Sequence, residues 1–401
     1  MSIRIKCYPA GNGESFLIKL QGKESTNILI DTGYKSTAEY IINDLDNIKN
    51  NGEKLDLFVL THIDNDHING ARDVLRYIID NDIELGEIWY NEYLCIQNLI
   101  DEFIDGCVEV EDEKLDRLAS MEYPKESTFS AREEVGIYQA TCLIDYLMND
   151  KIKNKWNKSF DDKCVYKNKY NSRIKINEDV VISIIGPNKD NLKSLYEEWK
   201  TYLDENMDNY TKSKNLIVAK AFEKYMILNN KSSLKSIVKS KCSSLELLDM
   251  INYEDFDKGT INRSSISIII EFNDRKLLFL GDSSPREMEK EIIDYSRKNG
   301  NRFEVCKVSH HGSRNNISKN MIESIECRKY LISTNGGTHS HPDIESIIKI
   351  LQLGNGNKTI YFNYKPKHII NMLNALGKLN ENQIRYLNED KFENQTLILD
   401  L

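Results

Sequence analysis

The segment His62-Ile63-Asp64-Asn65-Asp66-His67 decides how this chain of 401 residues is interpreted. It places two imidazoles and two carboxylates within six residues, directly after the apolar run 55–60. Imidazole and carboxylate groups at this spacing, behind a buried strand, are typical of a metal site built at a strand end. Taken alone, the segment could equally be a solvated surface loop.

Six of the seven histidines fall into three clusters of this kind. The other two clusters are Ser309-His310-His311-Gly312-Ser313 and His339-Ser340-His341-Pro342-Asp343. Each cluster follows a predicted strand, as does Gly281-Asp282, and loops at one end of the strands in layered α/β folds converge on a site. These companion motifs favour metal ligands over a surface loop. His368 stands apart, beside Lys365 and Lys367, and is interpreted as a surface residue.

The amino-acid composition limits the classes of protein to which this chain could belong. The formal net charge of −9 argues against sequence-independent nucleic-acid binding through a basic face, although 54 Lys and Arg residues leave room for a local basic groove. No apolar stretch approaches the ~18 residues needed to cross a bilayer, and the alternating N-terminus lacks the apolar core of a signal peptide. We therefore expect a cytoplasmic protein without a membrane partner. The eight cysteines form no CxxC pair, so buried, inert thiols are expected.

Alternating strand and helix signals flank two polar, helix-like stretches at about 94–175 and 188–259. The predicted strands are 15–20, 27–30, 55–60, 87–90, 180–185, 265–271, 277–280, 303–308, 330–333, 359–362 and 396–399. A first helix, which Thr37 could cap, is predicted with the inward residues Ala38, Ile41, Ile42, Leu45 and Ile48. A second helix has the inward residues Ala71, Val74, Leu75 and Ile78, and a third has Ile344, Ile347, Ile348 and Leu351. A further helix is predicted near 369–376.

We interpret residues 1–401 as a single domain that carries the two polar stretches as helical insertions. Two interpretations of the insertions remain open. They could be additions without a function, or they could form a wall or lid of the substrate pocket, or a surface for a protein partner.

His62-x-Asp64-x-Asp66-His67 resembles the metal motif of the metallo-β-lactamase superfamily, whose common form is HxHxDH. Asp31-Thr32-Gly33 and Gly281-Asp282 also resemble motifs of that superfamily. The segment 309–313 and His341-Pro342 resemble the branch represented by the hydrolase domain of the DNA-uptake protein ComEC. The turn Gly11-Asn12-Gly13-Glu14-Ser15 is similar to the opening turn of that branch, with Glu14 where an aspartate is usual.

The resemblance implies an α+β fold, a four-layer αββα sandwich with a dinuclear metal site at one edge. The implied metal ligands are His62 and Asp64 for one ion, Asp66 and His67 for the other, Asp282 bridging both, and His310 and His341, with His311 or His339 as neighbouring or alternative ligands. Asp31 would orient one of these ligands from behind.

Such a ligand set implies hydrolytic chemistry. Two cations roughly 3.5–4 Å apart can share a water and lower its pKa toward neutrality. Asp66 and His311 are the candidate catalytic residues, with Asp66 able to accept the water proton as well as bind metal. Ser313, Asn335 and the amides of Gly336-Gly337 could hold a phosphate or carbonyl oxygen, or could form an ordinary glycine-rich turn.

The identity of the metal depends on departures from the common motif. Asp64 stands where the superfamily usually has a histidine, and no histidine lies between His67 and His310. A site with more oxygen ligands than the common motif provides favours Mn²⁺ or Fe²⁺ more than the common motif does. Two Zn²⁺ ions remain the main expectation.

The function predicted from the sequence is that of a metal-dependent hydrolase acting on a phosphoester or phosphodiester, either a small molecule or a nucleic acid. One alternative is a diiron-type redox protein, because Asp64 is similar to the carboxylate of the oxygen-reducing members, but no flavodoxin-like domain follows. A second alternative is a catalytically silent metal-binding module. Oligomeric state is not predicted.

Overall fold

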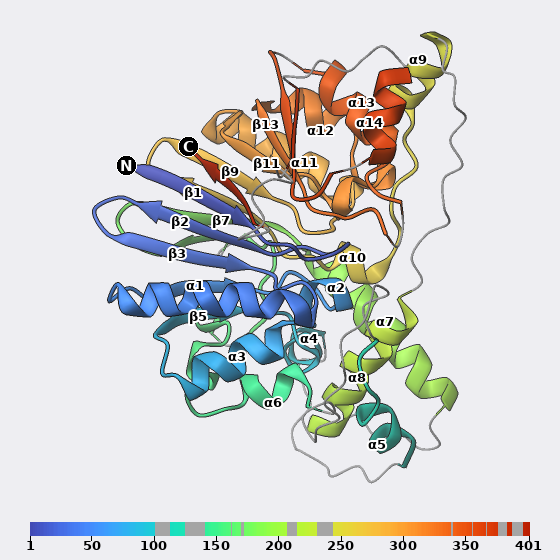
Figure 1. The fold of residues 1–401 in the computed structure, drawn as a ribbon. Coiled ribbons are helices and arrows are strands. Elements are labelled where there is room, and N and C mark those ends of the chain that lie inside the picture. Colours follow the sequence, from blue (N-terminus) through green and yellow to red (C-terminus); the bar gives the residue numbers. More distant parts are fainter. Residues whose placement is uncertain are drawn as a thin grey trace.

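Two β-sheets packed face to face form the centre of the molecule, and helices cover the outer side of each sheet (Figure 1). The coordinates are a computed structural model. They describe residues 1–100, 113–124, 141–161, 163–169, 172–206, 215–230, 244–337, 340–354, 356–365, 367–375, 383–386 and 396–401. The four-layer αββα sandwich of α+β class that the sequence predicted is confirmed.

The first sheet contains six strands in the order β16-β1-β2-β3-β4-β5, with β3, β4 and β5 parallel and the others antiparallel. Its strands are β1 (Ser2–Cys7), β2 (Phe16–Gln21), β3 (Ser25–Ile30), β4 (Leu55–Val59), β5 (Leu85–Trp89) and β16 (Leu397–Asp400). Every residue of β4 is buried, as expected for a parallel strand covered on both faces. The strands predicted at 15–20, 27–30, 55–60, 87–90 and 396–399 are thus confirmed.

The second sheet contains eight strands in the order β15-β14-β13-β11-β9-β8-β7-β6. Its strands are β6 (Arg173–Lys175), β7 (Val180–Gly186), β8 (Ser267–Phe272), β9 (Arg275–Phe279), β11 (Val305–Lys307), β13 (Lys329–Ile332), β14 (Thr359–Phe362) and β15 (Ile384–Tyr386). The strands from β9 to β15 are parallel to one another. The strand predicted at 303–308 is two strands, because β10 (Arg302–Phe303) leaves the sheet to pair with β12 (Glu326–Cys327).

Outer helices bury the faces that the sequence pattern predicts. In α1 (Ala38–Asn50) the inward residues are Ala38, Ile41, Leu45 and Ile48, and in α3 (Ala71–Asp80) they are Ala71, Val74, Leu75 and Ile78. Ile42 is only half-buried. Thr37 precedes α1 but makes no capping hydrogen bond with its side chain, because the chain enters the helix from a short 3₁₀ turn (Lys35–Thr37).

The second sheet carries its own helix layer, formed by α11 (Pro285–Asn299), α12 (Lys319–Ser324), α13 (Ile344–Gln352) and α14 (Lys367–Ala375). Three apolar cores separate the four layers. The core between the sheets includes Phe16, Ile18, Ile28, Val59, Ile182, Ile268 and Phe279. The outer cores lie under α1 and α3 on one side and under α11 to α14 on the other.

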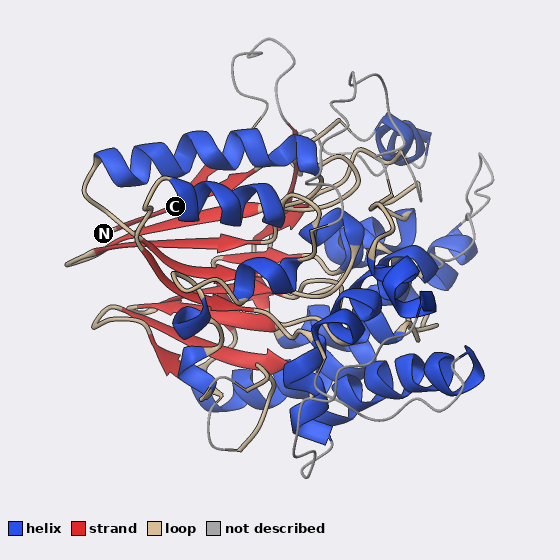
Figure 2. Cartoon of the chain, turned by 90° about the horizontal axis from the view of Figure 1, so that it is seen from below, coloured by secondary structure: helices blue, strands red, loops and turns tan. Residues whose placement is uncertain are grey.

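Helices of the two predicted insertions lie at one end of the strands, and others pack against the outer helix layers (Figures 1 and 2). They are α4 (Tyr93–Ile100), α5 (Glu113–Ala119), α6 (Leu143–Leu147), α7 (Lys189–Asn206), α8 (Leu216–Asn229) and α9 (Ser244–Asn252), followed by α10 (Thr260–Arg263). Buried aromatic side chains such as Trp199 and Phe222 pack α7 and α8 together, and they join the core under α1 and α3. The residues of β6 lie within the stretch 94–175 predicted as the first insertion.

Cysteines behave as the sequence predicts in the part of the chain that the structure describes. Cys7, Cys95, Cys142, Cys164, Cys306 and Cys327 are buried free thiols. Cys107 and Cys242 lie outside the described residues. Among the described helices, none combines the length and apolar character needed to span a membrane.

Candidate metal centre

Five parallel strands from the two sheets end at the same edge of the sandwich and deliver the polar motifs there. β3 is followed by Asp31 and β4 by His62, both from the first sheet. β9 is followed by Asp282 and β11 by His310 and His311, from the second. β13 leads into Ser333 and on to the loop of His341. Elements more than 200 residues apart in sequence thus contribute to one site, as the sequence analysis expected.

A short helix, α2 (Asn65–Ile68), turns the central motif inward. Asp64 starts this helix, and its Oδ1 accepts a hydrogen bond of 2.7 Å from Asn65 N. The first turn then directs Asp66 and His67 into the interior, where 9% and 0% of their surfaces are exposed.

Two glycines allow the backbone to approach the site closely. A Cβ atom on Gly13 would lie 2.0 Å from the carbonyl oxygen of Asp66, so only glycine lets the opening turn contact α2. Gly281 has φ +54° and lies against Ser265 and Thr61, where a Cβ would be 3.0 and 3.3 Å from their Cβ atoms. Both glycines therefore bring a neighbouring carboxylate, Glu14 or Asp282, into the cluster.

Four imidazoles are held by their Nδ1 atoms. His67 Nδ1 donates to Asp31 Oδ2 at 2.8 Å, and His311 Nδ1 donates to the Ser333 carbonyl oxygen at 2.9 Å. His310 Nδ1 lies 2.9 Å from Asn316 Oδ1. These acceptors hold the hydrogen on Nδ1 and leave the Nε2 lone pair free to bind.

Thr61 sets the tautomer of His62 in the same way. Its hydroxyl donates to Asp31 Oδ2 at 2.7 Å, so the hydroxyl oxygen is the acceptor for His62 Nδ1 at 3.0 Å. Asp31 Oδ1 also accepts from Thr61 N at 2.7 Å. Asp31 therefore orients His67 directly and His62 through Thr61, which extends the orienting role that the sequence analysis expected of it.

The Nε2 atoms converge on two carboxylates. Asp282 Oδ2 lies 3.3 Å from His67 Nε2, 3.5 Å from His311 Nε2 and 3.8 Å from His310 Nε2. Asp66 lies on the same side, with Oδ2 at 3.4 Å from His311 Nε2 and Oδ1 at 3.8 Å from His67 Nε2. The ring of His62 is 4.2 Å from that of His67, between centroids.

Buried nitrogen atoms that lack a hydrogen-bond partner indicate whether these residues could bind a metal ion. Nε2 of His62, His67 and His311 is buried and makes no hydrogen bond. A buried polar atom without a partner costs roughly 1–3 kcal/mol, and two of these three atoms, those of His67 and His311, lie within 4 Å of both Asp282 and Asp66. Imidazole nitrogen and carboxylate oxygen are common ligands of divalent transition metals. The donor set therefore fits one or more such cations.

Glu14 is part of the cluster, but it lies on the side of the Nδ1 atoms of the histidines rather than on the side of their Nε2 atoms. Glu14, His67, Asp282 and His311 each offer an atom within 4.8 Å of the others, a spacing compatible with a metal ion. However, Glu14 lies 3.8 Å from Nδ1 of His67 and 3.7 Å from Nδ1 of His311, which are the nitrogens already used in hydrogen bonds. Its carboxylate is paired instead with the ammonium group of Lys307.

Lys307 places a buried positive charge next to Glu14 and Asp282. This fully buried side chain contacts Glu14 Oε2, lies 3.5 Å from Asp282 Oδ1 and donates to the Gly281 carbonyl oxygen at 2.8 Å. Burial lowers the pKa of Lys307, but the charges of Glu14 and Asp282 outweigh it and raise the pKa above its ordinary value. Because Lys307 holds Oδ1, Asp282 turns Oδ2 toward the imidazoles.

Negative charge dominates the front of the site. Burial lowers the pKa of His67, yet the charges of Asp282 and Asp31 outweigh burial and raise it well above its ordinary value. Burial and then His67 lower the pKa of His62, which keeps that imidazole neutral. Burial and then the charge of Asp66 raise the pKa of Asp64 to about 7. Carboxylates that hold a proton so strongly on an imidazole also attract a metal cation.

Other predicted site residues lie farther out. Asp64 contacts Asn65 N and Asn230 Nδ2. The His341 ring is 5.4 Å from that of His310, and its Nδ1 is 3.5 Å from Asp343 Oδ2. His339 lies outside the described residues.

The backbone amides of the glycine-rich turn after β13 donate hydrogen bonds to side chains of the same turn. Gly336 N donates to Thr334 Oγ1 at 3.1 Å, and Gly337 N donates to Asn335 Oδ1 at 2.8 Å. Ser313 Oγ likewise accepts from Asn315 N at 3.3 Å. These contacts favour an ordinary turn over the oxyanion site that was the other interpretation.

His368 is half-buried, and its Nε2 lies 3.3 Å from the Pro342 carbonyl oxygen. His368 therefore lies partly at the surface and contacts the loop of His341.

Three residues of the site have positive φ angles. Asp31, His310 and His311 have φ values of 55°, 46° and 55°, in the left-handed region that side chains with a Cβ rarely adopt. Such backbone strain is maintained only where the surroundings enforce it, and it collects at functional sites. Here the strain aims two neighbouring imidazoles, His310 and His311, at the same carboxylate.

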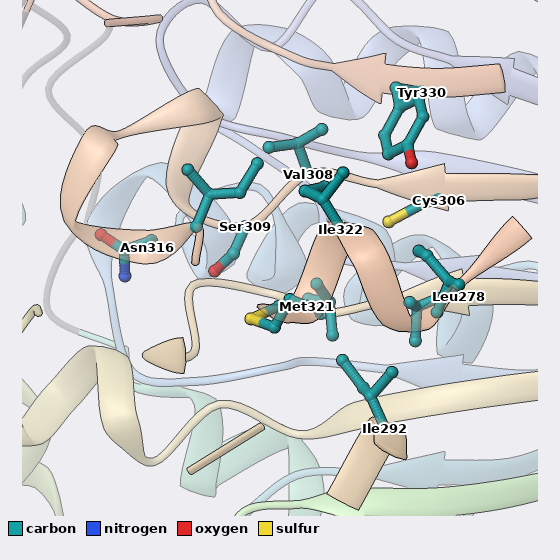
Figure 3. Close-up of a pocket in the computed structure, with 12 residues that line it drawn as sticks. Leu278, Ile292, Cys306, Val308, Ser309, Asn316, Met321, Ile322 and Tyr330 are labelled. Carbon is teal, nitrogen blue, oxygen red and sulfur yellow. The ribbon is translucent and has the colours of Figure 1, made fainter. Parts of the chain in front are cut away.

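A small apolar cavity lies beneath the His310 loop (Figure 3). Its lining includes Leu278, Ile292, Val308, Met321 and Tyr330, with Ser309 and Asn316 at one end. Its volume of about 10 Å³ leaves room for about one water. This cavity is too small to be the substrate site.

Replacing Asp31 by asparagine is expected to weaken metal binding by about 10–100-fold, the usual effect of losing the group that orients a histidine ligand. One carboxylate here accepts from Thr61 N, Thr61 Oγ1 and His67 Nδ1, and an amide cannot accept from all three. Zinc affinity measured by chelator competition checks this. Asp46→Asn is the matched control, since Asp46 accepts a hydrogen bond from Tyr77 in the outer helix layer. Equal affinities in the two variants would contradict the expectation.

The αββα sandwich carries at its edge an imidazole–carboxylate cluster that could hold a metal ion. Residues 8–98 match the family model described as the Metallo-beta-lactamase superfamily. The matched segment contains Glu14, Asp31 and the whole motif from His62 to His67. A comparison with curated proteins gave no match. The match and the buried cluster together point to a metal-dependent hydrolase.

Proposed function

We propose that this protein is a metal-dependent hydrolase of phosphoesters, with phosphodiesters as the favoured class. The observation that carries the proposal is the convergence of imidazole Nε2 atoms on Asp282 and Asp66, with each Nδ1 held by its own acceptor. The choice of phosphoesters is supported by the resemblance of residues 309–313 and His341-Pro342 to the ComEC-like branch.

The proposed ligands are the groups nearest the centre of the cluster, namely His62, Asp66, His67, Asp282, His310 and His311. Asp64 and His341, which the sequence analysis included, are proposed as outer ligands that become engaged when the site is loaded. When bound, two divalent cations supply Lewis-acid activation of water and of the phosphoryl group. Zn²⁺ is the first choice and Mn²⁺ or Fe²⁺ the alternatives, because the set mixes nitrogen and oxygen donors.

Asp66 is placed at the open side of the site. Its side chain is 12% exposed and that of His310 is 14% exposed, whereas His67 and Asp282 are almost fully enclosed. We infer that substrate approaches past Asp66 and His310. Asn12 Nδ2 donates to Asp66 Oδ2 at 3.2 Å, which leaves Oδ1 available to bind a metal ion.

Burial raises the pKa of Asp66, but His311 and His67 outweigh it and hold the pKa below its ordinary value. This carboxylate therefore stays ionised and suits a metal ligand better than a strong base. His311 is proposed as a ligand through Nε2, since its Nδ1 hydrogen is committed to Ser333. The reaction would join the water oxygen to phosphorus and release the ester oxygen as an alcohol.

A hydrolase panel with metal analysis tests the proposal. We expect protein stripped by a chelator to be inactive, and protein reloaded with Zn²⁺ or Mn²⁺ to hydrolyse bis(p-nitrophenyl) phosphate. The panel should include a phosphomonoester, single-stranded DNA, a lactone and a thioester. Diester cleavage that is equally fast in stripped and reloaded protein would contradict the proposal. Tight iron binding with oxygen reduction and no hydrolysis would favour the redox alternative instead.

A further inference from the structure

The second insertion touches the metal centre at two points. Asn230 follows α8, and its Nδ2 donates to Asp64 Oδ2. Asp257 precedes α10, and its Oδ2 lies 3.3 Å from His310 Nδ1. Both residues belong to the polar stretch 188–259, for which the sequence left two interpretations open.

Asp257 is held firmly where it meets His310. Its Oδ1 accepts from Gly259 N at 2.8 Å, and its Oδ2 accepts from Asn262 Nδ2 at 2.7 Å. Its backbone N donates to the Asn315 carbonyl oxygen at 3.0 Å. The Asp257 side chain is 15% exposed, so water competes little for the contact with His310.

The same carboxylate also reaches Asn316, the other group on His310 Nδ1. Asn316 Nδ2 donates to Asp257 Oδ2 at 3.2 Å and to the Asp282 carbonyl oxygen at 3.1 Å. Asp257, Asn316 and His310 thus form a closed set of contacts that leads to Asp282. Within this set, Asp257 supplies the only negative charge on the Nδ1 side of His310 among the residues the structure describes.

Two imidazoles of the centre therefore have a carboxylate next to their Nδ1 atom. Asp31, at the end of β3, lies 2.8 Å from His67 Nδ1, and Asp257, from the insertion, lies 3.3 Å from His310 Nδ1. A carboxylate in this position fixes the orientation of a histidine ligand and makes its other nitrogen a better donor. Only the first of these pairs comes from the sandwich itself.

We propose that Asp257 and Asn230 are positioning residues through which the second insertion sets the metal affinity of the site. Asp257 holds His310 with Nε2 directed at Asp282, as Asp31 does for His67. Asn230 holds the carboxylate of Asp64, at the position where the common motif has histidine. The inference rests on the proposed metal site, and it assigns the insertion a role in completing that site.

The contacts also link metal binding to the order of the insertion. A group that strengthens metal binding must itself be stabilised by the metal, because the coupling between two sites is reciprocal. Metal loading is therefore expected to slow amide hydrogen exchange in α8 and α10, because Asn230 directly follows α8 and Asp257 precedes α10.

The primary test is the zinc dissociation constant of Asp257→Ala, measured by competition with a chromophoric chelator. We expect binding about 10–100-fold weaker than in the wild type, the range typical for loss of a group that orients a ligand. Asp257→Asn keeps an acceptor without the charge and is expected to fall between the two. Asp255→Ala is the matched control, because Asp255 is 64% exposed and contacts only Lys258, at 3.9 Å, among the recorded ion pairs.

Asn230→Ala is paired with Asn229→Ala in the same assay. Asn229 is exposed, and its Nδ2 donates to the Tyr225 carbonyl oxygen of its own helix. We expect weaker zinc binding only in Asn230→Ala. Hydrogen exchange of α8 and α10, with and without Zn²⁺, should show metal-dependent protection in the wild type and in both controls, with less protection in Asp257→Ala.

The outcomes separate this inference from the proposed function. A wild-type protein that binds no zinc, manganese or iron would overturn the metal centre itself. A wild type that binds zinc, together with Asp257→Ala and Asn230→Ala variants of equal affinity, would overturn only the role of the insertion. If Asp257→Ala does not fold, as judged by circular dichroism of the metal-free protein, then Asp257→Asn and Asn230→Ala carry the same comparison.

Discussion

Asp282→Ala is expected to lower kcat/KM for a phosphodiester by at least about 10³-fold, the upper range for removing one preorganised charge-stabilising group. Asp282 Oδ2 is the only carboxylate oxygen of the described cluster within 4 Å of three imidazole Nε2 atoms. Its removal leaves His67 and His311 with Asp66 as the neighbouring carboxylate and takes away the carboxylate that lies within 4 Å of His310 Nε2. Bound metal per chain should also fall.

The measurement combines steady-state kinetics with elemental analysis of the dialysed protein. Asp294→Ala is the control, since Asp294 lies on α11, is 42% exposed and contacts Arg297 at 3.7 Å. The proposed centre would be wrong if Asp282→Ala retained both wild-type turnover and wild-type metal content. Loss of turnover with unchanged metal content would show that Asp282 acts on the substrate rather than on the metal.

Lys307→Met is expected to destabilise the metal-free protein by about 3–5 kcal/mol, the usual cost of removing one partner of a buried ion pair. Lys307 and Glu14 are each about 1% exposed, and Asp282 lies beside them. Without the ammonium group, two buried carboxylates face each other with no cation behind the site. Urea unfolding of the metal-free protein gives the change in free energy.

A double-mutant cycle with Glu14→Gln separates the ion pair from simple loss of packing. The double variant should lose less stability than the sum of the two single variants, because removing Glu14 eliminates part of the charge that Lys307 compensates. The exposed pair Arg4 and Asp400, whose side chains are 54% and 60% exposed, provides the control and should show far smaller effects. Strict additivity of Glu14→Gln and Lys307→Met would contradict the pairing.

Local sequence patterns were sufficient for most of the elements of the sandwich. The helical periodicity of α3 predicts all four of its buried residues, because that pattern depends only on which side of one helix is apolar. The split of the strand predicted at 303–308 was missed, since β10 and β11 are separated by a single residue and pair with different partner strands. Pairing is a long-range property.

For the site, the sequence was strongest on the residues that touch the proposed metal. His62, Asp66, His67, Asp282 and His310 were all predicted and lie together. Glu14 was noted only as a variant of a turn, and Lys307 was missed. A signal for Lys307 was present, because it is a lone cation in an otherwise apolar strand, and such a residue is almost never buried unless paired.

The residues alone predicted an imidazole–carboxylate cluster at the ends of the strands, and the resemblance of those motifs to the metallo-β-lactamase superfamily implied the αββα sandwich. Motif spacing and apolar periodicity are properties of neighbouring residues, so they can be seen without coordinates. The coordinates were needed to find that Lys307 and Glu14 lie on the Nδ1 side of the cluster and that Asp257 and Asn230, from the stretch 188–259, contact it. Those contacts join residues 53 to 293 positions apart, and such contacts depend on how the layers pack rather than on any local pattern.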